Sequence, residues 1–242
     1  MKTIDLHTHL RRDRETHNYL VEELLQESER FPDILRMISC LDGEVHQSNW
    51  KIRELCETYP ERFIGCAVID PKREDALQEA EDAASCALFK AFEFNSLEHG
   101  YIPETMPVID DIFDLAERQG MFIKCFTGWG DHTFCGQWEY YLYRHPNVKV
   151  IFLHMGDFWD GYSCIDIAQR HGNLYLDTSH VYELSIMRNA LKRVSHDRFV
   201  FGSYFPNMLT KWSLEFVDAY KLSEEDREKF LYKNALKLLE QE

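Results

Sequence analysis

The stretch Asp5-Leu6-His7-Thr8-His9 lies near the start of the chain, where apolar residues predict a first β-strand over Lys2–Leu6. Side chains two positions apart in a strand point to the same face. His7 and His9 therefore place two imidazoles side by side at the carboxyl end of this strand. Two neutral imidazoles that converge on one point are the start of a divalent metal site, and the rest of the chain must supply the remaining ligands.

Short apolar runs typical of strands recur along the whole chain and alternate with helical patterns. The predicted strands are Lys2–Leu6, Leu35–Cys40, Phe63–Ile69, Ala87–Phe94, Met121–Phe126, Val148–Leu153, Leu174–Asp177 and Arg198–Gly202. Apolar residues at helical spacing predict helices over Asn18–Arg30, Glu74–Ala84 and Val108–Gln119, and a last helix over Glu224–Glu240 that caps the barrel or packs outside it.

Eight strands that alternate with helices in 242 residues are typical of the α/β class and of a (β/α)8 TIM barrel. A doubly wound sheet usually carries a glycine-rich phosphate loop after its first strand, where this chain has His-Thr-His. No linker or shift in composition divides the chain, so we expect residues 1–242 to form a single domain.

Composition narrows the class of partner. The formal net charge of −15 argues against nucleic acid and against anionic membrane surfaces. No apolar stretch approaches the ~20 residues of a membrane span, and the first residues lack the apolar core of a secretory signal. The seven cysteines show no paired spacing, which favours reduced thiols and a cytoplasmic location. The expected partner is a small-molecule substrate.

The chemistry of such barrels lies at the carboxyl ends of the strands, and three further residues there are candidates for catalysis. His154 directly follows an apolar run and predicts a third metal ligand or an acid/base, the alternative being a core histidine bonded to backbone. Glu93 predicts a metal ligand or general base, or a carboxylate paired with a lysine or arginine in the barrel. Tyr204 is placed to face the mouth.

Two further groups of polar residues lie at predicted strand ends or close behind them. Asp177-Thr178-Ser179-His180 is expected to hydrogen-bond a substrate, or to cap the next helix through Ser179. Arg11, Arg12 and Arg14 follow the histidine pair and either line the mouth or form an exposed charged run.

Several stretches together resemble the amidohydrolase-related branch of the metal-dependent hydrolase superfamily. They are Asp5–Leu10, Glu61–Gly65 with Asp70-Pro71, Phe126-Thr127-Gly128, His154-Met155-Gly156, Gly202–Pro206 and the tail from Leu222 to Leu239. The resemblance covers most of the chain, and the stretches occur in the family's order and spacing. It implies a TIM barrel and a metal-activated water that attacks an amide, lactone or related carbon, or in some members a decarboxylation.

The resemblance also implies a ligand set from which this chain departs. The family takes metal on both first-strand histidines, a fifth-strand histidine and an eighth-strand aspartate, and its sixth-strand histidine binds metal or moves protons. Here Phe126 stands in place of that fifth-strand histidine and Tyr204 in place of the aspartate. With an unperturbed pKa near ~10, Tyr204 is a poor general base at neutral pH. The metal site is therefore degenerate relative to the family.

Three hypotheses follow. In the first, His7, His9 and His154 bind a divalent metal, with zinc preferred, and Glu93 serves as the base of a hydrolase; Asp157 and His180 are the alternative bases. In the second, the metal has been lost and the barrel binds a small molecule or partner without catalysis. In the third, His154 acts with Glu93 or Tyr204 as the acid and base of a metal-independent lyase or isomerase, or of a decarboxylase.

Overall fold

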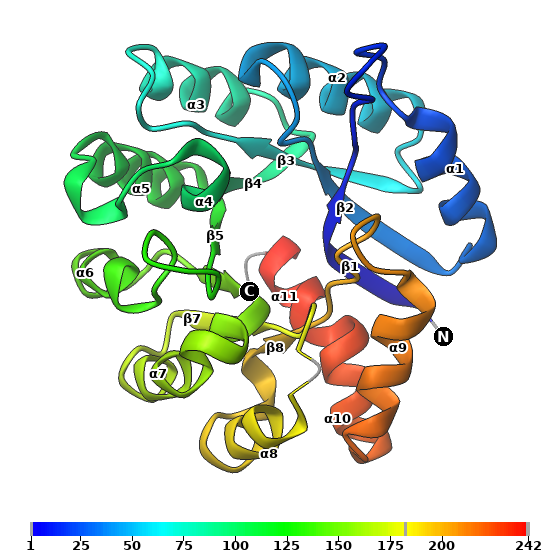
Figure 1. Ribbon diagram of the computed structural model, residues 1–242, viewed down its shortest axis with the longest axis vertical. Coiled ribbons are helices and arrows are strands. Elements are labelled where there is room, and N and C mark those ends of the chain that lie inside the picture. The colour runs from blue at the N-terminus through cyan, green and yellow to red at the C-terminus, as the bar shows by residue number, and fades with distance from the viewer. Residues whose placement is uncertain (1, 182, 241–242) are drawn as a thin grey trace.

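The computed structural model describes residues 2–181 and 183–240. Over these residues, eight parallel strands pair in chain order and form the barrel that the sequence predicts, with helices around it (Figure 1). The strands are β1 (Thr3–His9), β2 (Ile34–Ser39), β3 (Phe63–Val68), β4 (Phe89–Phe94), β5 (Phe122–Phe126), β6 (Val150–Leu153), β7 (Leu174–Asp177) and β8 (Phe199–Val200).

Most predicted boundaries agree with the structure to within two or three residues. The helices are α1 (Val21–Arg30), α2 (Val45–Thr58), α3 (Ala76–Ala84), α4 (Ser96–His99), α5 (Val108–Gln119), α6 (Gly136–Arg144), α7 (Asp157–Arg170), α8 (Leu184–Arg193), α9 (Thr210–Ala219), α10 (Glu224–Glu228) and α11 (Asn234–Glu240). The helix predicted over Val108–Gln119 coincides with α5, which Gly120 ends in a left-handed conformation.

The first strand is longer than predicted and contains an irregularity. β1 runs to His9 rather than ending at Leu6, and its register with β2 shifts between Asp5 and Thr8. A bulge of this kind re-aims the side chains that follow it. It explains how Leu6 packs inside the barrel while the next residue, His7, also joins the cluster at the mouth, which strict alternation forbids.

The segment after β8 completes the barrel beside β1. The ladder of β8 is shorter than the predicted Arg198–Gly202, but the chain continues alongside β1. The backbone N–H of Leu6 donates to the carbonyl of Phe201 at 2.9 Å, and the N–H of Tyr204 donates to the carbonyl of His7 at 2.8 Å. These bonds fix Tyr204 next to the histidine strand.

The last helical segment closes the amino-terminal end of the barrel. Ala235 and Leu238 of α11 pack against Ile4, Leu6 and Val200 inside the barrel, and Figure 1 shows α11 across the ring of strands. The single helix predicted over 224–240 is wrong in one detail, because a π-helical turn separates α10 from α11. This turn buries two adjacent residues, Phe230 and Leu231.

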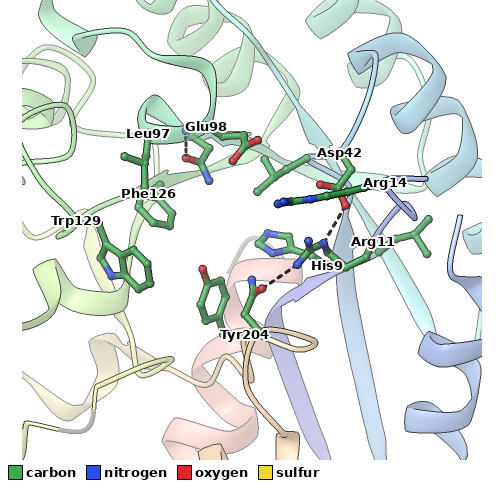
Figure 2. A pocket seen from close by; sticks show the side chains of 13 residues that line it. His9, Arg11, Arg14, Asp42, Leu97, Glu98, Phe126, Trp129 and Tyr204 are labelled. Atoms are coloured by element: carbon green, nitrogen blue, oxygen red, sulfur yellow. Dashed lines mark hydrogen bonds and ion pairs between the residues drawn. The ribbon is translucent and has the colours of Figure 1, made fainter. Parts of the chain in front are cut away.

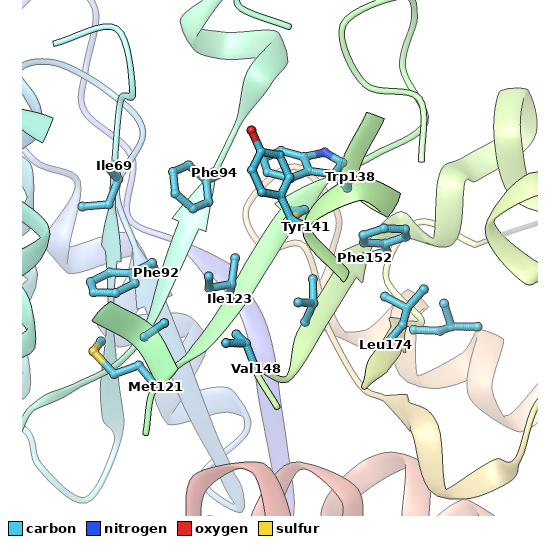
Figure 3. Close-up of a cluster of buried hydrophobic side chains, with 14 of the residues drawn as sticks. Ile69, Phe92, Phe94, Met121, Ile123, Trp138, Tyr141, Val148, Phe152 and Leu174 are labelled. Atoms are coloured by element: carbon cyan, nitrogen blue, oxygen red, sulfur yellow. The ribbon is translucent and has the colours of Figure 1, made fainter. Parts of the chain in front are cut away.

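A second apolar layer lies between the strands and the outer helices. Figure 3 shows part of it, where Trp138 and Tyr141 of α6 lie near Phe94 of β4. This layer holds the strands rigidly, so their carboxyl ends can position a site. All seven cysteines are free. No helix within the described residues is long and apolar enough to cross a membrane.

Candidate active site at the barrel mouth

A cavity of about 240 Å³ opens at the carboxyl ends of the strands. Figure 2 shows its two unlike sides, with Phe126 and Trp129 on one and Arg11 and Arg14 on the other. His9 also lines the cavity. Two carboxylates, Asp42 and Glu98, also line the cavity, and Asp42 pairs with Arg11. The cavity therefore offers aromatic surface opposite two arginines, an arrangement that suits a small acid with a flat apolar body.

The two arginines differ in their partners. The guanidinium Nε of Arg11 donates to Asp42 at 2.9 Å, and its Nη1 donates to Asn207 at 3.0 Å. Arg14 is exposed, and no ion pair or side-chain hydrogen bond to another described residue is found for it. Arg12 does not line the cavity, so of the three predicted mouth arginines two are at the mouth.

Below His9, a buried network surrounds the carboxylate of Glu93. Its Oε1 lies 2.9 Å from His9 Nε2, and its Oε2 accepts from Lys124 Nζ and from Ser39 Oγ, each at 2.8 Å. Burial would raise the pKa of Glu93, but the Lys124 ammonium and His9 beside it hold that pKa well below its usual value. Glu93 is thus an ionised carboxylate with a partner on each oxygen and a weak general base.

Next to this network, His7 and His154 share a second set of buried partners. His7 Nδ1 lies 3.0 Å from Ser179 Oγ and 3.2 Å from Asp177 Oδ2, and His154 Nδ1 lies 3.0 Å from the same hydroxyl. Burial lowers the pKa of His7 well below its usual value and that of His154 to about 3, so both rings are neutral at pH 7. Their Nε2 atoms are buried and have no hydrogen-bond partner within residues 2–181 and 183–240.

Tyr204 lies between the cavity and these two histidines. It lines the cavity and is 9% exposed, and its ring centroid lies 4.4 Å from that of His154 and 5.1 Å from that of His7. Burial, reinforced by the Glu93 charge, raises the pKa of Tyr204 to about 12. The phenol is therefore protonated at neutral pH and can donate a proton to a molecule in the cavity.

The backbone at the rim is unusually strained. His154, Met155, Asp157, His180 and Tyr204 all have positive φ between 47° and 63°, a region that side chains other than glycine seldom occupy. Such strain persists only where surrounding structure imposes it, and it clusters at functional sites. It supports a functional mouth over a merely structural one.

The structure brings the predicted residues together but groups them differently. The ligand atoms of His7, His9 and Glu93 lie within 4.8 Å of one another, and those of His7, His154 and Asp177 form a second such group. The three histidines predicted as one ligand set are therefore divided between two groups that share His7.

Several further residues were missed or misread from sequence. Lys124 belongs to the site through its bond to Glu93. The sequence sign that could have found it is a charged residue in the middle of the otherwise apolar strand β5. Ser179 does not cap α8, whose N-terminal flanking residue is Glu183; it bonds His7 and His154 instead. The two alternative bases lie side by side, with His180 Nδ1 3.3 Å from Asp157 Oδ2.

The residues present fit a divalent metal. His7, His9 and Glu93 supply two imidazoles and one carboxylate, a donor set that suits zinc, manganese or iron. The unpartnered, buried Nε2 of His7 is the atom that such an ion would satisfy. For His9 Nε2 to bind such an ion, the ion would have to replace its present contact with Glu93 Oε1 at 2.9 Å. Phe126 contributes no ligand atom, and its ring packs 5.1 Å from that of His154.

Solved structures with the same fold include enzymes with known reactions. A 5-carboxyvanillate decarboxylase from Sphingomonas paucimobilis superposes with a TM-score of 0.77 at 13% identity over 99% of each chain. A dihydroxybenzoic acid decarboxylase from Polaromonas, solved with bound manganese and the inhibitor 2-nitroresorcinol, gives 0.73 at 14% identity over 99% of this chain and 97% of that one. An uncharacterized TIM-barrel protein from Bordetella bronchiseptica gives 0.78 at 18% identity over 100% and 99%.

No curated protein sequence matches this chain significantly. The sequence model of one family, described as amidohydrolase, matches residues 4–241. That match spans the barrel from β1 to α11 and includes the histidine strand, the mouth and the segment that carries Tyr204. The chain therefore belongs to the amidohydrolase family.

Proposed function

We propose that this protein is a divalent-metal-dependent lyase that releases CO₂ from a small organic acid bound at the barrel mouth. The observation that carries the proposal is Tyr204, a protonated phenol that lines the cavity where the family resemblance implies an aspartate. His7, His9 and Glu93 would hold the ion. When bound, it supplies a positive charge that orients the substrate and stabilises negative charge in the reaction.

A decarboxylation needs a proton donor more than a base. The bond between the carboxylate and the substrate carbon breaks, the electron pair stays on that carbon, and the carbon takes a proton as CO₂ leaves. The Tyr204 hydroxyl is suited to give that proton and to recover one from solvent. A hydrolase instead needs a base to activate water, and the carboxylate beside the two first-strand histidines, Glu93, is already bonded to Lys124, Ser39 and His9.

The cavity suits an aromatic or similarly flat acid. Phe126 and Trp129 offer a surface for a flat ring, and Arg14 offers a positive charge without a partner among the described residues. The decarboxylases with the same fold act on ring-bearing acids according to their names, and one was solved with manganese. These likenesses support the reaction class and leave the identity of the acid to experiment.

Hydrolysis is the second candidate, and His154 is the observation that favours it. Its ring is neutral, and its Nε2 has no partner among the described residues and can accept a hydrogen bond from water. Many proteins of this superfamily are hydrolases, as the resemblance implies. The two reactions differ in their dependence on Tyr204, because only the lyase uses its hydroxyl proton.

The test is turnover by the protein loaded with Mn²⁺ or Zn²⁺ on aromatic acids labelled with ¹³C at the carboxylate, and on matched esters, lactones and amides. Release of ¹³CO₂, with deuterium on the product carbon in D₂O, supports the lyase. Tyr204→Phe should slow that release by about 10²- to 10⁴-fold, the usual contribution of a general acid. Tyr143→Phe, a matched change at a residue that is 79% exposed, should leave it unaltered.

Other outcomes select the alternatives. Hydrolysis without CO₂ release that survives Tyr204→Phe selects the hydrolase. Binding of acids at the mouth without turnover of any compound, in protein that holds metal, selects a barrel that binds a small molecule without catalysis.

A further inference from the structure

One hydroxyl group joins two histidines from different strands. Ser179 Oγ lies 3.0 Å from His7 Nδ1 and 3.0 Å from His154 Nδ1, and it also forms a short hydrogen bond to Asp177 Oδ2. His7 comes from β1, His154 follows β6, and Asp177 ends β7. All four side chains are buried, so water does not compete for these bonds.

The protons in this arrangement can be counted. A serine hydroxyl donates one hydrogen bond and accepts two. The Ser179 hydroxyl donates its proton to the Asp177 carboxylate. Without that proton, the short contact would join two oxygen atoms that can only accept. Ser179 Oγ must then accept from both imidazoles, and each Nδ1 must carry a proton.

The contacts of Asp177 support the same assignment. Its two oxygens face backbone N–H groups of Ser179 and His154, at 3.1 and 3.3 Å, as well as the Ser179 hydroxyl and His7 Nδ1. Four donors around one carboxyl group are the environment of an acceptor-only carboxylate. His154 Nδ1 has a further acceptor in the carbonyl oxygen of Ser179, at 3.3 Å.

We infer that Ser179 and Asp177 are positioning residues that lock His7 and His154 in the same tautomer, with Nδ1 protonated. Both Nε2 atoms then carry lone pairs, and both are buried without a hydrogen-bond partner among the described residues. The pair forms a preset acceptor for a divalent cation or for a proton of the substrate. The tautomers do not depend on a metal; their use as ligands rests on the proposed function.

Removal of such supporting contacts typically weakens metal binding by about 10- to 100-fold. The structure predicts this loss for Ser179→Ala, which deletes the shared acceptor and keeps the backbone. Ser179→Thr retains the hydroxyl and should restore binding. Ser195→Ala, a matched change at an exposed serine that caps a short helix away from the mouth, should change nothing.

The decisive measurement is made on the metal-free protein at pH 7.5. Ring-¹⁵N histidine correlation spectra report which nitrogen of each ring is protonated, and His7→Asn and His154→Asn assign the two signals. Wild type should show Nδ1–H on both rings, and Ser179→Ala should shift both toward a mixture of tautomers. Binding of Mn²⁺ alone is measured separately by calorimetry.

The possible results separate the two proposals. An Nε2–H tautomer on either ring of the wild type overturns the inference, whether or not any variant folds. Tautomers that stay unchanged in both Ser179→Ala and Asp177→Asn also overturn it. If wild-type protein has the expected tautomers but binds no Mn²⁺ or Zn²⁺, the positioning role stands and the metal-dependent function fails.

Discussion

Replacement of Lys124 by methionine tests the central electrostatic feature of the site. Lys124 and Glu93 are both fully buried, and the Lys124 Nζ lies 2.8 Å from Glu93 Oε2. In Lys124→Met the carboxylate keeps Ser39, His9 and the weak contact from Cys66 Sγ at 4.0 Å, and all of these are uncharged or weaker partners than the ammonium. Removal of one member of a buried ion pair typically costs about 3 to 5 kcal/mol, because the other charge stays buried without compensation.

We therefore expect the free energy of unfolding of the metal-free protein to fall by about 3 to 5 kcal/mol in Lys124→Met. The measurement is urea denaturation followed by circular dichroism and tryptophan fluorescence. Lys90→Met is the matched control, since Lys90 lies on β4 at a half-buried position and should cost less than about 1 kcal/mol. The double variant Lys124→Met/Glu93→Gln should recover most of the loss, because no unpaired charge remains.

A divalent ion should rescue the single variant. It would replace the missing positive charge beside Glu93, so Mn²⁺ at 100 times its dissociation constant should return about 2.7 kcal/mol of stability. The same ion should bind Lys124→Met more tightly than wild type, since a competing ammonium is gone. Loss of less than about 1 kcal/mol in Lys124→Met, or weaker Mn²⁺ binding than in wild type, would refute the reasoning that Glu93 depends on Lys124 and faces the metal.

Three further predictions concern the same mouth. The pKa of His154 is about 3 in the folded protein and about 6.5 in the unfolded chain, so the unfolded chain gains the proton first as the pH falls. The free energy of unfolding of the metal-free protein should therefore drop by about 2 kcal/mol between pH 7 and pH 5. Denaturation curves of His154→Asn at each pH should lack this part of the loss. A Cβ at Gly202 would lie 2.3 Å from an oxygen of Asp177, so Gly202→Ala should lower the free energy of unfolding by about 1 to 3 kcal/mol and weaken Mn²⁺ binding. Gly172→Ala, where a Cβ would meet open space, should do neither. Equal effects of the two variants would contradict the packing. Phe126→His adds an imidazole near the ligand cluster and should raise Mn²⁺ affinity about tenfold by calorimetry, as a contact of about 1.4 kcal/mol would; unchanged affinity would place residue 126 outside reach of the ion.

The barrel was predictable because its signal is repeated. Each strand is a short apolar run and each helix an apolar stripe, so an error at one boundary does not change the count. The boundary errors have local causes. The end of β1 was missed because a bulge breaks the alternation near Leu6, and the π turn at Lys229–Lys233 depends on packing of Phe230 against Phe199.

The site was predictable in membership more than in arrangement. His7, His9, Glu93, His154 and Tyr204 do meet at the mouth, since carboxyl ends of parallel strands converge there. Their division into two networks depends on the directions of hydrogen bonds. It also depends on partner residues whose neighbours in the sequence do not mark them as part of a site. A lysine inside an apolar strand and a serine after β7 acquire their roles only when distant strands are placed side by side.

The seam between β1 and the segment after β8 has a consequence for how the protein forms. Asp5 accepts from the backbone N–H of Ser203, 198 positions later, and from the guanidinium of Arg36. Contacts of such sequence separation form slowly, because the intervening chain must be ordered first. During synthesis the histidine strand emerges from the ribosome early but is enclosed only after the final strand has been made. Until then one edge of β1, the strand that carries His7 and His9, stays open to pairing with other chains and needs protection.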